Sequence, residues 1–352
     1  MKIKVDKRRW HFAIVNLILV VLVLVCLAVF LSIRGTLDSI HAADRYRGDN
    51  EMRFAQIAAF LPVDGGKAEE DIFLFREVLN QKLVDASLEA PEGASLYTDA
   101  YSGRINLTVS GDHGQANVKA IGVGGDFFQF HPLRLRSGSY ISGDDFMLDR
   151  VVLDETLAWQ LFGGFDVAGL TVTISGKPFQ VAGVVRRESD FATKEAYQDG
   201  ASMFLSYSAM KALDENSTIT CYEIVMPDPI TGFAKGIVQE NFTVDTGDIV
   251  ENSSRYSLEN LFSVVGQFGK RSMRNNGVIY PYWENAVRLT EDYLALLLVL
   301  MLLFGLTPAV TLLVLAIRLV IRTWRTLKKQ VPARLDRARE RHREKIYAKD
   351  RE

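Results

Sequence analysis

The 352-residue sequence predicts an α+β domain that lies between two transmembrane α-helices. Residues 12–33 contain no charged side chain, and residues 293–317 form a second apolar run of similar length. About 20 apolar residues are enough to cross a bilayer, so each run predicts a transmembrane helix. Between them, residues 34–292 mix helical and alternating apolar patterns, which indicates helices and strands in a region long enough to bury its own core.

The first apolar run fits a retained membrane anchor better than a cleaved signal peptide. A signal peptide has an apolar core of about 7–15 residues, followed by small residues at a cleavage site. The run at residues 12–33 is longer, and the sequence Leu31-Ser32-Ile33-Arg34 offers no such site. We therefore expect this helix to remain in the protein.

Basic residues predict which side of the membrane each segment occupies. They precede the first run and follow the second: Lys2, Lys4, Lys7, Arg8 and Arg9, then Arg318, Arg322, Arg325, Lys328 and Lys329. Such residues stay cytoplasmic, so we expect residues 1–11 and the basic tail 318–352 inside the cell and residues 34–292 outside. Aromatic residues at the two boundaries match the belts of membrane proteins. They are Trp10 and Trp324 inside, and Tyr280, Tyr282, Trp283 and Tyr293 outside.

The cysteines and the net charge argue against two classes of protein. Cys26 lies in the first apolar run and Cys221 is alone in the exterior segment, so no disulfide can form within the exterior domain. A domain of this kind is more typical of a bacterial envelope than of an animal cell surface. The formal net charge of −2 gives no support to nucleic-acid binding.

The exterior segment mixes expected strands and helices along its length. Strands are expected where apolar side chains alternate or form short runs: residues 56–63, 104–111, 118–124, the hairpin 170–185, the start of 204–213, and 222–226. Helices are expected where apolar residues recur three and four positions apart: residues 69–89, 155–164, the end of 204–213, and 230–242. Residues 186–202 are polar and lack a sustained pattern, which indicates a surface loop.

Local signals mark the ends of the first two helices. In the helix at 69–89 an apolar face is formed by Ile72, Phe75, Leu79, Leu83 and Ala86, and Pro91 and Gly93 are expected to close it. Asp154 is placed to cap the helix at 155–164, which Gly163 and Gly164 end.

An ordered series of short motifs runs from residue 118 to residue 185. A strand that ends in Gly122, Gly124 and Gly125 leads to the pair Phe127-Phe128. Four further pieces follow in order: Leu133, Leu135 and Gly138; an acidic turn at Asp144-Asp145; a helix with Ala158, Leu161, Phe162 and Gly163; and a hairpin that ends in Val181, Gly183 and Val184.

This series resembles the extracytoplasmic core domain of MacB-like ABC transporter permeases, in the FtsX-related superfamily. The resemblance implies a MacB-like periplasmic core, a separate ATPase subunit as partner, self-association or a further permease chain, and membrane helices that move when the ATPase closes. Such permeases usually carry one transmembrane helix before the core domain and three after it. One helix is expected on each side here, so the resemblance implies a shortened permease-like or accessory subunit.

The stretch of glycines and phenylalanines has two interpretations. Gly124 and Gly125 can adopt backbone angles that other residues resist, which lets the chain leave the strand and bury Phe127 and Phe128 as a packing corner. The alternative is a ligand pocket lined by the two phenylalanines.

The second apolar run and the tail also have two interpretations each. Pro308, close to Gly305, removes a backbone hydrogen bond in the run, and Thr307 or Thr311 can satisfy the freed carbonyls. A static kink is favoured over a hinge.

Pro332 can start a helix in the tail, which is expected to lie near anionic headgroups. The alternative is docking on an ATPase subunit through Arg322, Arg325, Lys328 and Lys329.

No cluster of residues suggests catalysis, a cofactor or a metal. His113 and His131 are not in metal-ligand spacing with another ligand residue. Asp144-Asp145 and Asp154 are explained by a turn and a helix cap. The sequence contains no G-x-x-x-x-G-K-[ST] loop, so any ATP use belongs to a separate chain.

These observations predict a two-pass protein of the cell membrane that is not an enzyme. We expect a subunit of an ABC transporter-like complex, for export or mechanotransmission, that couples a separate ATPase to an exterior domain. The alternative is an exterior ligand sensor or scaffold that acts through a partner chain, since two helices around an exterior domain is also the plan of membrane receptors.

Overall fold

A computed structural model of the chain describes residues 7–349, except residues 50, 89, 91–94, 143–146, 198–199, 243–246, 269–270, 272–273 and 276. In the last helix, side chains are described as far as residue 328. The acidic turn expected at Asp144-Asp145 and the helix end expected at Pro91 and Gly93 lie outside the described residues. The chain forms two compact units, one of Met1–Leu31 with Leu296–Glu352 and one of Ser32–Ala295.

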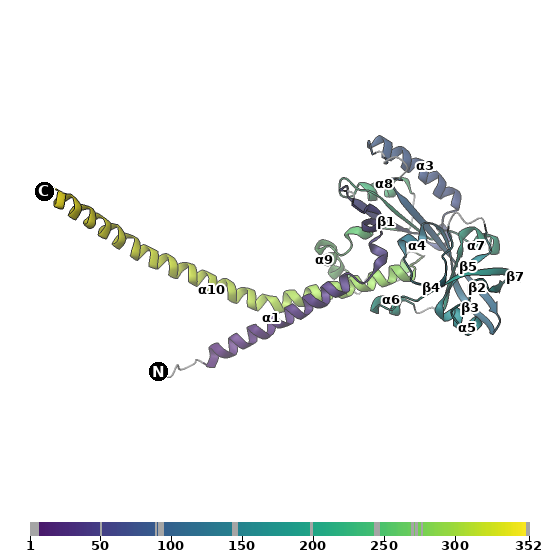
Figure 1. Cartoon of the computed structure of the whole chain (residues 1–352), viewed down its shortest axis with the longest axis horizontal. Coiled ribbons are helices and arrows are strands. Elements are labelled where there is room, and N and C mark those ends of the chain that lie inside the picture. Colours follow the sequence, from purple (N-terminus) through teal and green to yellow (C-terminus); the bar gives the residue numbers. More distant parts are fainter. Residues whose placement is uncertain are drawn as a thin grey trace. The chain divides into compact units, whose positions relative to one another are not determined.

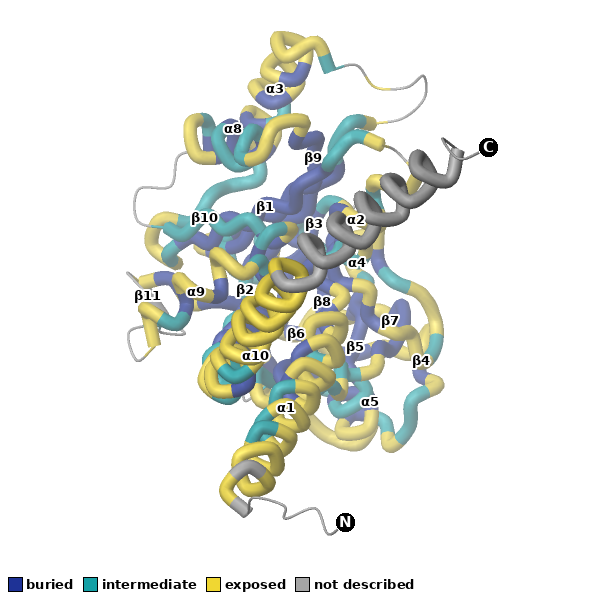
Figure 2. Tube along the Cα trace, turned by 90° about the vertical axis from the view of Figure 1, so that its left-hand side faces the viewer, coloured by how far each residue is buried: buried dark blue, intermediate teal, exposed yellow. Residues whose placement is uncertain are grey.

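The first unit is built from two long apolar helices (Figure 1). α1 spans Lys7–Arg34 and α10 spans Tyr282–Lys349. Within them, Trp10–Arg34 and Tyr282–Lys328 are long and apolar enough to cross a membrane. Both helices carry many exposed Leu, Ile and Val side chains, and they are largely yellow in Figure 2. Apolar surface on this scale indicates a membrane protein rather than one surrounded by water.

α10 is a single helix along its whole length. Its backbone is helical through both Pro308 and Pro332. The tail is helical, as expected, but its helix does not start at Pro332, because α10 continues through that residue. A proline removes only its own N–H from the hydrogen-bond ladder, so the turns on either side can continue. The first residues of α10, as far as Ala295, belong to the second unit.

The second unit contains a mixed sheet. Within the described ranges it has ten strands: β1 (Phe54–Phe60), β2 (Thr98–Gly111), β3 (Gly114–Gly125), β4 (Leu135–Gly138), β5 (Arg150–Asp154), β6 (Thr171–Ile174), β7 (Lys177–Val185), β8 (Ser202–Ser206), β9 (Cys221–Pro227) and β10 (Asp248–Glu251). The order is β10-β1-β9-β2-β3-β8-β5-β7-β4, and β6 pairs with β2 and β7. The pairs β3–β8 and β5–β7 are parallel, and the others are antiparallel. A separate hairpin is formed by β11 (Arg274–Asn275) and β12 (Val278–Ile279).

Half of the sheet closes on itself. The pairings run from β2 through β3, β8, β5, β7 and β6 and return to β2. β2 is long enough to serve both halves, since its start pairs with β9 and its end pairs with β6. Closure gives these strands neighbours on both sides, whereas β4, which pairs only with β7, remains at an edge. The open half, β9, β1 and β10, leads to the segment that contacts α10.

The described part of the second unit also contains helices before α10, and those that contact the sheet lie on both of its halves. The helices are α2 (Ala42–Arg47), α3 (Glu69–Asp85), α4 (Phe127–Phe130), α5 (Glu155–Phe162), α6 (Phe191–Ala196), α7 (Tyr207–Leu213), α8 (Phe233–Asn241) and α9 (Leu258–Gly266). In β1, Ile57 and its alternate neighbours belong to a core with α3 and α8, whereas Ala58 and its neighbours belong to a core with α2, α4 and Trp283. Alternate strand residues point to opposite faces, so β1 is buried on both sides (dark blue in Figure 2).

Most of the expected elements are confirmed. The expected strands correspond to β1, β2, β3, β6, β7, β8 and β9, and the expected helices correspond to α3, α5, α7 and α8. The surface loop expected at residues 186–202 is wrong in part, because Asp190 caps α6 by accepting a hydrogen bond from the Thr193 N–H (2.9 Å). The sequence analysis missed β10 and α9.

Replacement of Gly125 by alanine is expected to destabilise the domain strongly. Gly125 has φ +62°, and a Cβ there would lie 2.4 Å from the Asp99 carbonyl oxygen. The matched control is Gly176→Ala, where φ is +79° but no atom lies within 4 Å, so only backbone strain of about 1–2 kcal/mol is expected. Thermal unfolding of the full chain in detergent measures both, at about 2–4 °C per kcal/mol. Equal losses for the two variants would contradict the packing argument.

Candidate functional site

Three charged residues share one face of the first turns of α10. Glu284, Arg288 and Glu291 are four and three positions apart, and such residues are neighbours on a helix surface. This part of α10 belongs to the unit Ser32–Ala295. Buried charges need partners, and these come from Arg255 and Arg271, which lie on either side of α9. We call these five residues the α10 anchor.

Arg255 is the centre of the α10 anchor. Its Nε donates to Glu291 Oε1 (2.6 Å), and its terminal nitrogens donate to the two oxygens of Glu284 (both 2.7 Å). Longer bonds reach Glu291 Oε2 (3.3 Å) and Asn252 Oδ1 (3.1 Å). These bonds use all five N–H groups of the guanidinium. The side chains of Arg255 and Glu284 are 4% and 2% exposed, so the pair is almost completely removed from water.

Arg255 stays charged despite its burial. Burial alone would lower the pKa of its guanidinium, but the carboxylates of Glu284 and Glu291 raise that pKa well above its ordinary value. Breaking a buried ion pair by removing one partner costs about 3–5 kcal/mol, because the remaining charge is left without compensation. The α10 anchor therefore holds the start of α10 firmly to the segment before α9.

Arg271 and Arg288 extend the α10 anchor in two directions. Arg271 donates to Glu291 and to Asp292 Oδ1 (2.8 Å). Arg288 donates to Glu284 Oε1 (2.6 Å) and to Asp248 Oδ2 in β10 (2.7 Å). Its guanidinium also lies 3.7 Å from the centroid of the Tyr280 ring, a cation–π geometry. The start of α10 is thus joined to the sheet and to the segment after α9.

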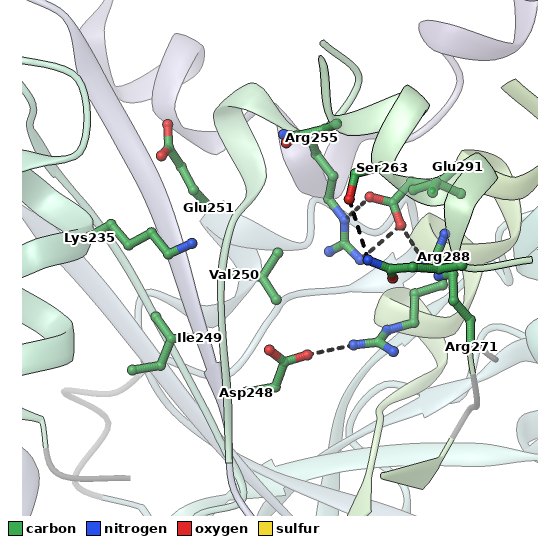
Figure 3. A pocket seen from close by; sticks show the side chains of 13 residues that line it. Lys235, Asp248, Ile249, Val250, Glu251, Arg255, Ser263, Arg271, Arg288 and Glu291 are labelled. Carbon is green, nitrogen blue, oxygen red and sulfur yellow. Dashed lines mark hydrogen bonds and ion pairs between the residues drawn. The ribbon is translucent and has the colours of Figure 1, made fainter. Parts of the chain in front are cut away.

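A pocket of about 480 Å³ opens beside the α10 anchor (Figure 3). Arg255, Arg271, Arg288 and Glu291 line it on one side, and Lys235 of α8 lies on the other. The lining carries both positive and negative groups. A site of this kind suits a small polar ligand with charges of its own better than an apolar one.

Another side of the first turn of α10 packs on aromatic rings. The Trp283 ring centroid lies 4.5 Å from that of His131 and 5.5 Å from that of Phe127. His131 Nε2 is 2.6 Å from Glu223 Oε2, and both side chains are buried. Aromatic pairs of this geometry contribute about 0.5–1.5 kcal/mol beyond their burial. The start of α10 therefore has ionic contacts on one side and aromatic contacts on another.

Comparison with known families identifies the domain. The family described as MacB-like periplasmic core domain matches residues 14–231, which is more than half of the chain. The chain belongs to this family. The resemblance inferred from the motifs at residues 118–185 is thereby confirmed, and so is the α+β fold class.

Two curated relatives of the MacB-like chain are each named macrolide export ATP-binding/permease protein MacB. The protein from Aggregatibacter actinomycetemcomitans is 27% identical over 112 residues, which are 31% of this chain and 17% of that protein. The protein from Chromobacterium violaceum is 38% identical over 71 residues, which are 20% of this chain and 11% of that protein. The matched regions are therefore a small part of both relatives.

Solved structures of MacB-like domains are also similar. The periplasmic region of MacB from Actinobacillus actinomycetemcomitans has a TM-score of 0.41 at 14% identity, over 62% of this chain and 93% of that one. The extracellular domain of the transporter YknZ from Gram-positive bacteria has a TM-score of 0.38 at 14% identity, over 56% of this chain and 100% of that one.

The contacts of α10 form two groups: those with residues that the family matches, and those with residues beyond them. Phe127, His131 and Glu223, which hold Trp283, lie within the matched residues 14–231. Arg255 and Arg271 lie beyond them. The aromatic contacts thus join α10 to the MacB-like core, and the α10 anchor joins it to the segment that follows this core.

The structure places the glycine–phenylalanine stretch at the aromatic contact. Gly125 ends β3, and after Asp126 the chain forms the short helix α4. Phe127 is 2% exposed, and its ring meets those of Trp283 and Phe204. Phe128 stacks on Tyr140 with ring centroids 4.6 Å apart. Both rings thus pack against neighbouring side chains. This packing supports the interpretation as a packing corner over that of a ligand pocket.

The other glycines of that stretch sit against large side chains. A Cβ on Gly122 would lie 2.6 Å from Met210 Sδ, and a Cβ on Gly124 would lie 2.2 Å from the Tyr101 ring. Both positions therefore need glycine for close packing of α7 and β2 on β3.

The remaining motif residues gather in the closed half of the sheet. Gly138 pairs directly with Gly183 across β4 and β7. Asp154 caps α5 by accepting from the Leu157 N–H (2.7 Å), and it also accepts from the Ser202 N–H (2.6 Å). Val181 and Ala158 are buried, Phe162 is half-buried, and Gly163 ends α5 with φ +68°. None of these residues belongs to the α10 anchor.

The expected hinge and docking residues lie in the first unit. Gly305 faces α1, since a Cβ on it would lie 3.9 Å from Val23. The Thr311 hydroxyl donates to the Thr307 carbonyl (2.8 Å), whereas the carbonyl that Pro308 frees is that of Phe304. In the tail, Arg322, Arg325 and Lys328 are exposed. The side chains of Lys2, Lys4 and Lys329 lie outside the described part of the chain.

The aromatic belt expected at the outer boundary is wrong for two of its four residues. Tyr280 is 1% exposed and Trp283 is 5% exposed, so neither ring is available to lipid headgroups. They pack on Phe60 and on His131 instead. Tyrosine and tryptophan suit both a membrane interface and a core with polar partners, so the sequence did not distinguish the two.

The sequence analysis missed the α10 anchor. The spacing of Glu284, Arg288 and Glu291 could have predicted it. Charges on one helix face directly before an apolar run indicate ion pairs with another part of the chain. Arg255 has no local signal, since its partners lie 29 and 36 residues along the chain.

Replacement of Arg255 by methionine is expected to destabilise the domain by about 3–5 kcal/mol, because Glu284 and Glu291 lose their most deeply buried cation and keep only Arg288 and Arg271. Adding Glu284→Gln and Glu291→Gln to that variant is expected to restore part of the loss, since Arg288 and Arg271 still have Asp248 and Asp292. Thermal unfolding of the full chain measures both effects, with the exposed Arg186→Met as the matched control. A loss under about 1 kcal/mol, the range of surface pairs, would show that the α10 anchor does not hold the helix.

The carboxyl of Glu188 is expected to make the stability of the domain depend on pH. Burial raises the pKa of its carboxyl, and the Tyr197 hydroxyl donates to it (3.4 Å). A raised folded-state pKa means that the stabilising contribution is full below the unfolded-state pKa and is lost as pH rises through the folded-state pKa. Glu188→Gln keeps the hydrogen bond and removes the charge. It is therefore expected to raise the melting temperature at pH 7.5, with a gain that vanishes in acid.

Melting curves of wild type and Glu188→Gln between pH 4 and pH 8 measure the effect, with the exposed Glu195→Gln as control. A gain that stays constant across this range would rule out titration of Glu188 as its cause.

Proposed function

We propose that the chain is a two-span membrane subunit of an ABC transporter-like complex, for export or mechanotransmission. In this proposal residues 1–11 and 318–352 are cytoplasmic, residues 12–33 and 293–317 cross the membrane, and residues 34–292 lie outside. A separate ATPase subunit supplies the energy, and the chain associates with itself or with a further permease chain. The exterior MacB-like domain is the part that the ATPase cycle moves.

The single observation that carries the proposal is the continuity of α10. One helix runs from Tyr282 to Lys349, and its first turns hold the α10 anchor and the Trp283 contacts. A displacement of this helix cannot be absorbed at its start without breaking buried ion pairs. It is passed on to β10, α9 and the core.

The names of the relatives support an ATPase as part of the complex. The sequence has no phosphate-binding G-x-x-x-x-G-K-[ST] loop, while the relatives are named ATP-binding/permease proteins. In the proposal the exposed basic groups Arg322, Arg325 and Lys328, with Lys329, dock on the ATPase. Gly305 and Pro308 are the positions at which α10 can bend.

Purification of the full chain from its native membrane in mild detergent tests the proposal. An ATPase subunit is expected in fixed ratio, and Arg322→Glu with Arg325→Glu is expected to release it. The charge-matched control is Arg134→Glu with Arg186→Glu, two exposed arginines of the exterior domain. A chain that purifies without any ATPase would contradict the transporter proposal.

A ligand sensor is the second candidate, and the pocket beside the α10 anchor favours it. A ligand there would touch Arg255, Arg271 and Glu291, the residues that hold α10. Binding would therefore change the contacts of a helix that enters the membrane. Ligand-dependent stabilisation of the purified chain, with no ATPase bound, would favour this function.

A further inference from the structure

α9 presents three different faces. Leu261 and Val264 are buried and point toward the domain. Asn260, Ser263 and Gln267 line the pocket beside the α10 anchor. The third face is apolar and lies open, and we call it the outer stripe of α9. Its residues are Leu258, Phe262 and the half-buried Val265, and the exposed Phe268 follows two residues after the helix ends.

The outer stripe follows the helix period. Its residues are four and three positions apart, so they lie on one face of the helix. Leu258, Phe262 and Phe268 are 60%, 50% and 42% exposed. Apolar side chains scattered singly over a surface need no explanation, but an aligned set of this kind marks a contact surface.

Both ends of α9 are tied to the residues directly before the apolar run of α10. Arg255, three residues before α9, bonds to Glu284 and Glu291. Arg271, three residues after Phe268, bonds to Asp292 (2.8 Å), the last residue before the run at 293–317. The residues Tyr293–Ala295, with which that run begins, belong to the same compact unit as α9. α9 therefore lies at the level where α10 enters its apolar run.

A second contact, which does not involve the α10 anchor, lies where the apolar run of α10 begins. The exposed ring of Phe191, at the start of α6, meets the ring of Tyr293 edge-on with centroids 5.0 Å apart. Phe191 is 56% exposed although it contacts the first residue of the run. Two elements thus carry exposed phenylalanines at the point where α10 becomes apolar.

We propose that the outer stripe of α9 lies in the outer leaflet of the membrane, at the boundary between headgroups and acyl chains. The proposal rests on the topology of the proposed function. Amphipathic helices in this position bury their apolar face roughly 5–10 Å below the headgroups. The domain then rests on the bilayer through α9 and Phe191, in addition to its covalent link to α10.

Lipid fits the outer stripe better than a second protein chain. A stable protein interface buries about 800 Å² on each partner, with a polar rim around an apolar centre. Three side chains of a nine-residue helix, with Phe268 after them, are too few for such an area. A lipid surface needs only an apolar line at the right depth, and the ion pairs of Arg255 and Arg271 fix that depth.

Spin labels on the full chain in phosphatidylethanolamine–phosphatidylglycerol vesicles test the proposal. Phe262→Cys and Leu258→Cys report on the outer stripe. Leu74→Cys on α3, whose side chain is 67% exposed, is the aqueous control, and Leu302→Cys in α10 reports on the span. The native Cys26 and Cys221 are buried, and the unmodified chain measures any labelling of them. Collisions with oxygen, which concentrates in lipid, are compared with collisions with a water-soluble nickel chelate.

We expect labels at 258, 262 and 302 to favour oxygen over the chelate several-fold more than the label at 74. If position 302 is in lipid but position 262 is as open to the chelate as position 74, the outer stripe proposal is overturned and the topology stands. Protection of 262 from both reagents would overturn it in favour of a covering protein. A label at 302 that is open to the chelate would overturn the topology and the stripe proposal together.

Discussion

The burial of one positive charge is the constraint on which the end of this domain depends. Arg255 is charged and almost fully removed from water, so it needs carboxylates in fixed positions, and both of them come from α10. An exposed ion pair contributes at most about 1 kcal/mol, but breaking a buried one costs about 3–5 kcal/mol. The first turns of α10 are therefore part of the domain and not a linker to it.

The MacB-like core also contacts α10, but through aromatic rings and not through ion pairs. β2 belongs to both halves of the sheet, and at the end of its hairpin partner β3 the turn at Gly125 directs Phe127 against Trp283. Glu223 on β9 holds the neighbouring His131. The glycine–phenylalanine stretch is thus explained by packing, and what it packs against is the start of α10. Ionic and aromatic contacts together make the start of α10, as far as Ala295, part of the domain.

Local patterns predicted most of the fold, because strands and amphipathic helices such as α3 bury alternate or periodic side chains within one short segment. The cap at Asp154 was predictable for the same reason. The α10 anchor was not, since the partners of Arg255 are distant in sequence and its burial arises only from tertiary contact. Trp283 was misassigned because a ring with a polar edge suits a core as well as a membrane interface. α9 was missed because apolar residues on two of its faces obscure its period.

The central claim is that the start of α10 is locked to the exterior domain, and hydrogen exchange of residues 284–292 in the full chain tests it most directly. Amides that are held by the buried contacts can exchange only when a large part of the domain opens. The account predicts that they exchange as slowly as the amides of β9 in lipid nanodiscs, and that Arg255→Met speeds their exchange by orders of magnitude. Fast exchange in the wild-type chain, close to that of a frayed helix end, would contradict it.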